Sequence, residues 1–255
     1  MIIGSDSPDH RRQVVREEFD REARIYGQSR AVHRGYLLQR DHTLRLVGTG
    51  HRRILDLGCG TGDTLRAACP TGTSGVGVDL SLQMLAHAQL RVQEPKLLFV
   101  AADACSLPVA SGTFDAVISV GLMEYIWPDP RAPREMARVL RQGGIAVIAF
   151  PHKQCLARRV GESARIAYQG ARSVFGVNKT IVRTIDRPRA ADFDRAMAAC
   201  GFERDTALFC YPQLLDWPLR EMLPLVDVDW GVRLDPILGR SRWFGRIYVS
   251  RWRLA

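Results

Sequence analysis

The 255-residue chain has an ordinary globular composition, with 46% apolar and 25% charged residues. Its length allows one large domain or two small ones with a substantial core. Residues 1–12 are polar and charged and lack the apolar stretch of a secretory signal, and the longest apolar runs, 115–123 and 145–151, are far too short to span a bilayer. We therefore expect a cytoplasmic protein without a transmembrane segment; this leaves peripheral contact with a membrane open.

The charge and the cysteines narrow the classes of partner. Six cysteines are scattered without a C-x-x-C pair or a histidine at zinc spacing, which predicts reduced thiols and no metal site. The net charge of +9 comes almost wholly from arginine, and a basic balance can indicate a nucleic acid, an anionic lipid surface or an acidic substrate. Because the arginines are spread along the chain, we expect general surface charge and no nucleic-acid partner.

Residues 1–50 are predicted to form a helical cap. Apolar residues between Val14 and Tyr26 recur at spacings of three and four, which is typical of an amphipathic helix. A second helix is expected to begin near Ser29.

Residues 51–151 alternate short apolar runs with amphipathic segments. The expected strands are 54–57, 75–78, 97–100, 114–120 and 144–150, and the expected helices are 63–68, 81–91 and 131–141. Strands that are apolar throughout and are joined by helices form a parallel sheet covered on both faces. We therefore predict an α/β fold with a Rossmann-like, doubly wound, mostly parallel seven-stranded sheet, whose ligands bind beyond the carboxyl ends of the strands.

The rest of the chain is predicted to add an inserted lid and the C-terminal part of the same domain. Residues 152–189 are rich in arginine and show no strand pattern, so we assign them to a lid that binds the acceptor. In residues 190–255, a helix over 190–200 precedes strands near 206–210 and 246–251. Aromatic residues in 1–50 and 152–245 suit an apolar ligand, and the arginines of the lid suit an anionic head group.

The glycine-rich turn after the first expected strand is the most informative local pattern. Residues 56–62 read DLGCGTG, and glycine suits a sharp turn that a ligand approaches closely. A dinucleotide fingerprint would need its third glycine at position 63 or 65, where Asp63 and Leu65 stand. A carboxylate at the start of the helix disfavours a pyrophosphate there. The turn therefore predicts a ligand without phosphate and disfavours a nicotinamide dehydrogenase.

Asp79 ends the second expected strand, about 20 positions after the glycine turn. An acid at this distance can accept hydrogen bonds from ribose hydroxyls. The alternative role is a cap of the following helix, which Ser81 could itself supply. A ligand with a ribose and no phosphate follows from the two patterns together.

Five segments together resemble the class I S-adenosylmethionine-dependent methyltransferases. They are ILDLGCGTG at 54–62, GVDLS at 77–81, ADACSLP at 102–108, GTFDAV at 112–117 and RVLRQGG at 138–144. One glycine loop is a weak signal, whereas five segments in the family's order are specific; they cover about residues 50–151 and are similar to the branch of ubiquinone and menaquinone biosynthesis. The resemblance implies S-adenosylmethionine as cofactor and a small-molecule acceptor that is aromatic, quinone-like, a lipid or a natural-product intermediate.

The resemblance also assigns cofactor contacts by position. Asp56 would anchor the cofactor's amino group directly or through water, Asp79 would hold the ribose, and Asp103 would accept a hydrogen bond from the adenine amino group. The positions implied around the cofactor are Asp56, Gly58, Gly60, Gly62, Asp79, Leu80, Asp103, Ala104, Ser119 and Gly121. Turn formation is the alternative role for Asp103, and strand-end packing is the alternative for the last two. Tyr26 could close over the cofactor or belong to the core.

Methyl transfer from a sulfonium is a direct SN2 displacement that needs a dry, aligned pocket and no covalent enzyme intermediate. A hydroxyl acceptor would also need a general base. The two candidates are His152, after the fifth strand, and Glu124, after the fourth; His152 could instead be solvated or position the substrate, and Glu124 could cap a helix or pair with an arginine. We expect no metal, because the acidic constellation of the metal-dependent relatives has no counterpart.

Other functions remain open at this level. They are an RNA-binding methyltransferase, a non-catalytic protein that keeps the fold, and an enzyme that uses the same cofactor for aminopropyl transfer. The polar-Pro-Pro-aromatic tetrad of amino-methylating nucleic-acid enzymes is missing, because residues 121–124 read GLME, and there is no Pro-Cys nucleophile. A small-molecule acceptor is thus favoured, with the chain acting as a monomer or homodimer.

Overall fold

The computed structural model describes residues 7–32, 34–91, 94–156, 187–212 and 241–255. Within these residues the strands form one seven-stranded sheet in the order β3-β2-β1-β4-β5-β7-β6. Strands β1 to β5 are parallel, and β7 is antiparallel to both of its neighbours. The strands are β1 Arg53–Leu57, β2 Ser74–Asp79, β3 Leu97–Ala101, β4 Phe114–Val120, β5 Leu140–Pro151, β6 Phe202–Pro212 and β7 Gly245–Leu254. The predicted fold class is confirmed.

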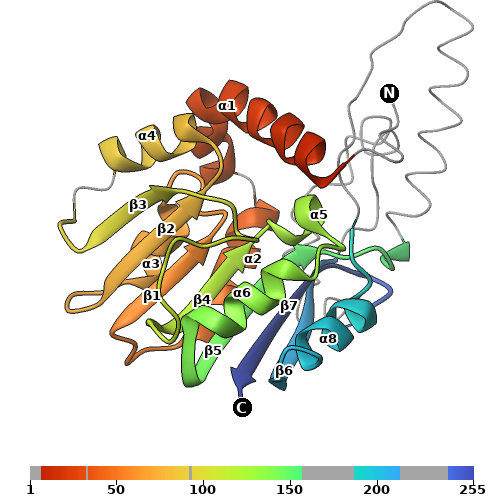
Figure 1. Cartoon of the computed structure of the whole chain (residues 1–255). Coiled ribbons are helices and arrows are strands. Elements are labelled where there is room, and N and C mark those ends of the chain that lie inside the picture. Colours follow the sequence, from red (N-terminus) through yellow and green to blue (C-terminus); the bar gives the residue numbers. More distant parts are fainter. Residues whose placement is uncertain (1–6, 33, 92–93, 157–186, 213–240) are drawn as a thin grey trace, which may run out of the picture.

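Helices cover both faces of the sheet (Figure 1). They are α1 Pro8–Val32, α2 Arg34–Val47, α3 Asp63–Ala68, α4 Leu82–Arg91, α5 Met123–Ile126, α6 Arg131–Val139 and α8 Ala190–Ala198. Side chains of α5, α6 and α8 belong to one buried cluster, and those of α2 and α3 belong to a second cluster. On β1, Ile54 packs into the second cluster and Leu55 into the first, as the two-residue period of a strand requires. Strands covered on both faces are mostly apolar, which is why they could be predicted.

The element bounds differ from expectation where polar residues hide the pattern. Strand β5 begins at Leu140, which pairs with Phe114 before a register shift, so α6 ends at Val139. Strands β6 and β7 are longer than expected. Charged residues at their ends interrupt the apolar pattern from which the bounds were predicted. Helix α2 begins at Arg34 rather than near Ser29, and the single-turn α5 was not expected. Most of the predicted lid, residues 157–186, lies outside the described residues.

Helix α1 crosses the carboxyl-terminal edge of the sheet next to α4 (Figure 1). It is amphipathic and rich in charge, so it does not bury itself in the core. None of the described helices is long and apolar enough to cross a bilayer. The position of α1 matters because this edge is where an open α/β sheet binds its ligands.

Candidate functional site: the carboxyl-terminal edge under helix α1

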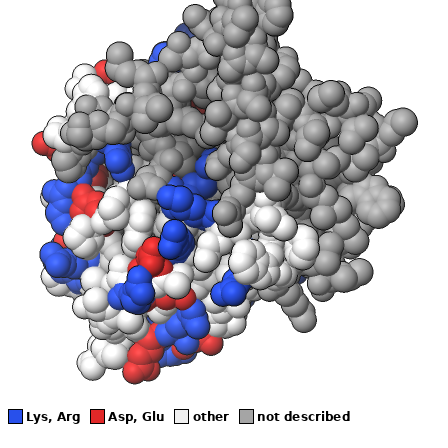
Figure 2. Space-filling model, turned by 90° about the vertical axis from the view of Figure 1, so that its right-hand side faces the viewer, with Lys and Arg blue, Asp and Glu red and all other residues white. Residues whose placement is uncertain are grey.

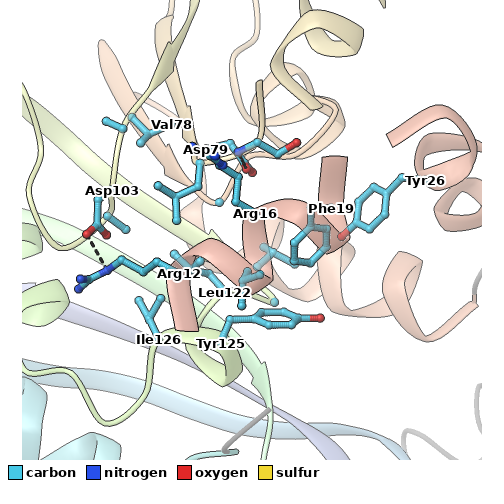
Figure 3. A pocket seen from close by; sticks show the side chains of 18 residues that line it. Arg12, Arg16, Phe19, Tyr26, Val78, Asp79, Asp103, Leu122, Tyr125 and Ile126 are labelled. Carbon is cyan, nitrogen blue, oxygen red and sulfur yellow. Dashed lines mark hydrogen bonds and ion pairs between the residues drawn. The ribbon is translucent and has the colours of Figure 1, made fainter. Parts of the chain in front are cut away.

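Two adjoining pockets lie at this edge, under α1. The larger pocket lies between α1 and the carboxyl ends of β2, β3 and β4, and Asp79 and Asp103 are its acidic residues. The smaller pocket surrounds Asp56. Figure 3 shows Arg12 reaching from α1 to Asp103 at one end of the larger pocket, with the rings of Phe19 and Tyr26 toward the other end.

The glycine loop takes a conformation that only glycine adopts easily. Gly58, Gly60 and Gly62 have φ of 70°, 53° and 76°. Gly58 lines both pockets, whereas a Cβ on Gly62 would lie 2.8 Å from the Phe99 ring. Gly58 therefore gives a ligand access to the backbone, while Gly62 allows α3 to pack closely on the sheet.

Asp79 links the glycine loop to the start of α4. Its Oδ2 accepts from the Gly60 amide at 2.9 Å, and its Oδ1 accepts from the Ser81 amide at 2.9 Å. Burial raises the pKa of Asp79, and these amides oppose that shift. Ser81 Oγ itself accepts from the Met84 amide at 3.1 Å, so Ser81 rather than Asp79 caps α4. The Asp79 carboxylate remains part of the pocket wall, with Leu80 beside it.

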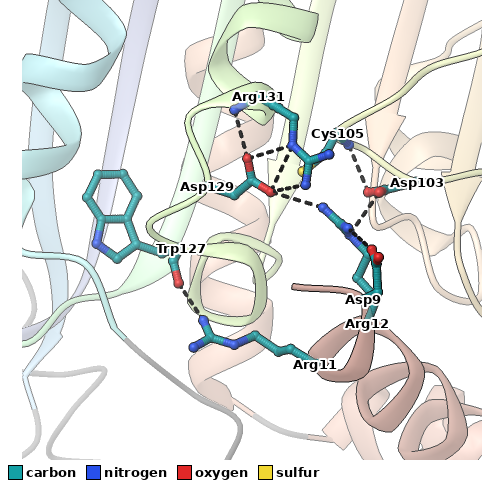
Figure 4. Close-up of polar contacts among 8 residues, drawn as sticks. All are labelled: Asp9, Arg11, Arg12, Asp103, Cys105, Trp127, Asp129 and Arg131. Carbon is teal, nitrogen blue, oxygen red and sulfur yellow. Dashed lines mark hydrogen bonds and ion pairs between the residues drawn. The ribbon is translucent and has the colours of Figure 1, made fainter. Parts of the chain in front are cut away.

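Asp103 both forms a turn and borders the pocket. Its Oδ1 accepts from the Cys105 amide at 2.9 Å, which is the turn alternative, and its Oδ2 lies 2.8 Å from Arg12 Nε. Arg12 also pairs with Asp129, with Nη2 2.9 Å from Oδ2 (Figure 4). Ala104 lines the same pocket. Arg12 was not among the predicted site residues, because nothing distinguishes it from the other arginines of α1 in the sequence.

Arg12 is therefore expected to anchor α1 to the sheet. The pairs with Asp103 and Asp129 are partly buried, so Arg12→Met should lower the free energy of unfolding by about 1–2 kcal/mol, or the melting temperature by roughly 2–6 °C. Thermal unfolding followed by circular dichroism checks this. Arg16→Met is the matched control, because Arg16 is exposed one turn later on the same helix. Equal melting temperatures for the two variants would contradict the anchoring role.

Asp56 is the unusual acid of the smaller pocket. Only 1% of the residue is exposed, and its Oδ2 has no hydrogen-bond partner among the described residues. Burial, followed by the neighbouring charge of Asp79, raises its pKa well above the ordinary value, and a hydrogen bond from the Leu65 amide opposes the shift. A buried carboxylate oxygen without a donor is unfavourable by itself. This arrangement fits a ligand that brings a cation or a strong donor.

The remaining predicted cofactor positions differ in their surroundings. Gly121 has φ 76° and lines the larger pocket. Ser119 is fully buried, and its hydroxyl donates to the Leu57 carbonyl at 3.2 Å, so the packing alternative describes Ser119 better than ligand contact. Tyr26, Gly58 and Val120 line both pockets. The two pockets are therefore one elongated site, from Asp103 past Asp79 to Asp56.

Comparison with known proteins places most of these site residues in a methyltransferase domain. Residues 54–144 match the methyltransferase domain family. The demethylmenaquinone methyltransferase of Beutenbergia cavernae is 44% identical over 98 residues, which are 38% of this chain and 40% of that enzyme. The enzyme of the same description from Symbiobacterium thermophilum is 34% identical over 148 residues, 54% of this chain and 59% of that one. Residues 54–144 therefore form a methyltransferase domain of the class I S-adenosylmethionine-dependent type.

A solved structure extends the likeness of fold beyond the matched residues. The methyltransferase in the Haloferax volcanii complex with the Trm112 activator superposes with a TM-score of 0.67 at 22% identity, over 93% of this chain and 97% of that chain. At this identity the likeness concerns the fold alone. The sequence matches to the two demethylmenaquinone methyltransferases span 40% and 59% of their lengths. What those relatives share with this methyltransferase is therefore mainly the cofactor-binding region.

The residues of the site fit the family's cofactor, S-adenosylmethionine. This molecule carries an adenosine without phosphate at one end and an ammonium at the other. Asp56 Oδ2 is the buried acceptor that lacks a donor, and it lies at the opposite end of the site from Asp103. Asp56 Oδ2 is the main evidence that the site suits S-adenosylmethionine, because Asp79 and Asp103 already accept hydrogen bonds from the protein.

His152, one of the two candidate general bases, is not placed at either pocket. The residue directly follows β5 at the carboxyl-terminal edge of the sheet, but it is fully buried and lines neither pocket. Its Nε2 lies 2.6 Å from the Gly245 carbonyl, its Nδ1 accepts from the Gln154 amide at 3.2 Å, and its ring lies 4.9 Å from that of Phe209. Both ring nitrogens are thus engaged in holding β7 and the segment after β5, so His152 has a structural role.

Glu124 also lines neither of the two pockets. It lies in the single turn of α5 and only 7% of the residue is exposed. Its neighbours Leu122, Tyr125 and Ile126 line the larger pocket, but Glu124 does not. These apolar and aromatic neighbours, together with Phe19 of α1, are site residues that sequence patterns did not reveal.

Charge on the described surface is mixed. Arg131 pairs with Asp129 at 2.7 Å, and Arg138 pairs with Glu135 at 2.7 Å. Figure 2 shows basic and acidic side chains side by side on the described part of the visible face. Among the described residues, no group of three or more His, Cys, Asp or Glu is placed to hold a metal ion.

Proposed function

We propose that this methyltransferase transfers the methyl group of S-adenosylmethionine to a small aromatic or quinone-like acceptor. The observation that carries the proposal is the row of three acids along one site, ending in the unpaired, buried Asp56 Oδ2. The demethylmenaquinone methyltransferases to which the chain is similar support the acceptor class. The mixed surface charge supports a small molecule over RNA.

Each acid would have its own part in binding. Asp79 would accept from the ribose hydroxyls, Asp103 from the adenine amino group, and Asp56 would hold the ammonium as an ion pair. When bound, the cofactor supplies an electrophilic methyl group on a sulfonium. Phe19, together with other apolar lining residues, would exclude water from it.

The described lining supports direct transfer by proximity and alignment. Neither pocket presents a histidine among the described residues, and the carboxylates they present are Asp56, Asp79 and Asp103. We therefore propose that the acceptor is nucleophilic by itself, as the electron-rich ring of a hydroquinone is. In such a reaction the enzyme contributes mainly the orientation of the two reactants.

Calorimetry with S-adenosylmethionine, S-adenosylhomocysteine and NAD tests cofactor choice. We expect micromolar affinity for the first two and none for NAD. Methyl transfer to a reduced naphthoquinone without a ring methyl, followed by mass spectrometry, tests the acceptor, with a short RNA as the alternative. Binding of NAD instead of S-adenosylmethionine would overturn the proposal. Methylation of the RNA, with a strongly salt-dependent affinity, would favour the nucleic-acid alternative.

A further inference from the structure

Tyr26 stands where the two pockets meet. It is one of the residues that line both of them, with Gly58 and Val120, and it comes from α1 rather than from the sheet. Its Cε1 lies 3.5 Å from the place that a Cβ on Gly60 would take. The ring therefore lies close to the glycine loop at Gly60.

Packing holds this ring in place. The Phe19 ring lies 5.7 Å from that of Tyr26, edge to face, and Phe19 in turn lies 5.1 Å from the ring of Tyr125. Helix α1 is fixed at a second point, because Asp20 Oδ1 accepts from Ser81 Oγ at 2.6 Å. Arg12 and Asp20 thus attach α1 to the sheet edge at Asp103 and Ser81, and Phe19 of the same helix packs against the Tyr26 ring.

The junction is also where the charge of the cofactor must lie. In S-adenosylmethionine the sulfur joins the nucleoside to the amino acid, so a molecule with its ribose at Asp79 and its ammonium at Asp56 places the sulfonium between them. The side chains shared by the two pockets at that point are the Tyr26 ring and Val120. An aromatic ring beside a desolvated cation stabilises it by about 0.5–2 kcal/mol.

We propose that Tyr26 is a specificity-determining residue that makes the site prefer the charged sulfonium cofactor to its neutral, demethylated product. S-adenosylhomocysteine has the same ribose and the same ammonium, but it lacks both the methyl group and the positive charge on sulfur. The ring therefore stabilises the cofactor before transfer and not the product after it, which favours product release. This inference rests on the proposed function and names a residue that the family's cofactor segments do not contain.

The test compares charged and neutral ligands in Tyr26 variants. Dissociation constants are measured for S-adenosylmethionine, for S-adenosylhomocysteine, and for sinefungin, which carries an amine in place of the sulfonium methyl. We expect Tyr26→Leu and Tyr26→Met to lower the affinity for S-adenosylmethionine and for sinefungin about 3- to 30-fold. The affinity for S-adenosylhomocysteine should change by less than about 2-fold. Tyr26→Phe should keep the wild-type preference. Ile25→Leu is the control, because Ile25 is adjacent and 63% exposed.

The outcomes separate this inference from the proposed function. Equal weakening of all three ligands in Tyr26→Leu and Tyr26→Met would mean that the ring only packs, and would overturn the inference while the proposed function stands. Unchanged affinities would overturn it as well. If the wild-type protein bound none of the three ligands, the proposed function itself would fail. Circular dichroism of each variant verifies that the fold is kept.

Discussion

Asp79→Ala is expected to lower the affinity for S-adenosylmethionine by at least about 100-fold. Two charge-assisted hydrogen bonds to the ribose hydroxyls are each worth about 1.5–3 kcal/mol, which together correspond to that loss or more. The variant also removes the acceptor of the Gly60 and Ser81 amides, so the glycine loop loses a fixed position. Calorimetry with S-adenosylmethionine measures the effect, at a temperature where the variant is folded.

Asp115→Ala is the matched control for this experiment. Asp115 is likewise a buried acid on a strand, and its Oδ2 accepts from two amides, those of Arg52 and Arg53. It lies at the beginning of β4, however, at the edge of the sheet opposite to the site. We expect Asp115→Ala to lower the melting temperature without changing cofactor affinity. A large loss of affinity in both variants would show that Asp79 acts through stability alone.

The sheet and Asp79 could be predicted from local pattern and spacing, whereas Asp56 and Asp103 came from the resemblance of their segments to the family. Strand β4 is buried on both faces, and all of its residues except Asp115 and Ser119 are apolar, while the helices between strands have their own period. Asp56 lies near the end of β1, Asp79 ends β2, and Asp103 follows β3. Parallel strands bring their carboxyl ends to one edge, and proximity therefore follows from topology.

The packing of α1 over the site and the directions of the side chains could not be predicted in this way. Arg12 meets Asp103 only because α1 packs across the sheet edge, a contact between residues far apart in sequence. His152 directly follows β5, as expected, but its ring packs beside Phe209 of β6 and does not reach the site. Tertiary packing decides which residues cover the end of a strand, and the spacing of residues in the sequence does not reveal that packing.

Asp56→Asn is expected to stabilise the protein without ligand and to weaken cofactor binding about 10- to 100-fold. In the wild-type protein the buried carboxylate has one oxygen without a donor, and an amide removes that unfavourable charge, worth about 1–3 kcal/mol at neutral pH. The asparagine oxygen can still accept from the Leu65 amide. For the cofactor, the same change removes an ion pair with the ammonium, which accounts for the loss of affinity.

Both the stability and the cofactor affinity of Asp56→Asn relative to the wild-type protein should depend on pH. Because folding raises the pKa of Asp56, the protonated form stabilises the ligand-free wild-type protein, fully below the ordinary aspartate range. That contribution is lost as pH rises through the raised pKa. The excess melting temperature of Asp56→Asn should therefore be small in acid and grow with rising pH. Binding of an ammonium favours the ionised carboxylate, so wild-type affinity should fall as pH falls through the raised pKa, and that fall should be absent from the variant.

Methylthioadenosine separates the ammonium from the rest of the cofactor. It keeps the adenosine and the sulfur but has no amino-acid part, so its affinity should be the same in Asp56→Asn and in the wild-type protein. Asp79→Ala should weaken it strongly, since the ribose remains. If methylthioadenosine lost affinity in Asp79→Ala and not in Asp56→Asn, Asp56 would be assigned to the ammonium and Asp79 to the ribose. If Asp56→Asn weakened methylthioadenosine as much as S-adenosylmethionine, Asp56 would shape the pocket through the glycine loop rather than bind the ammonium.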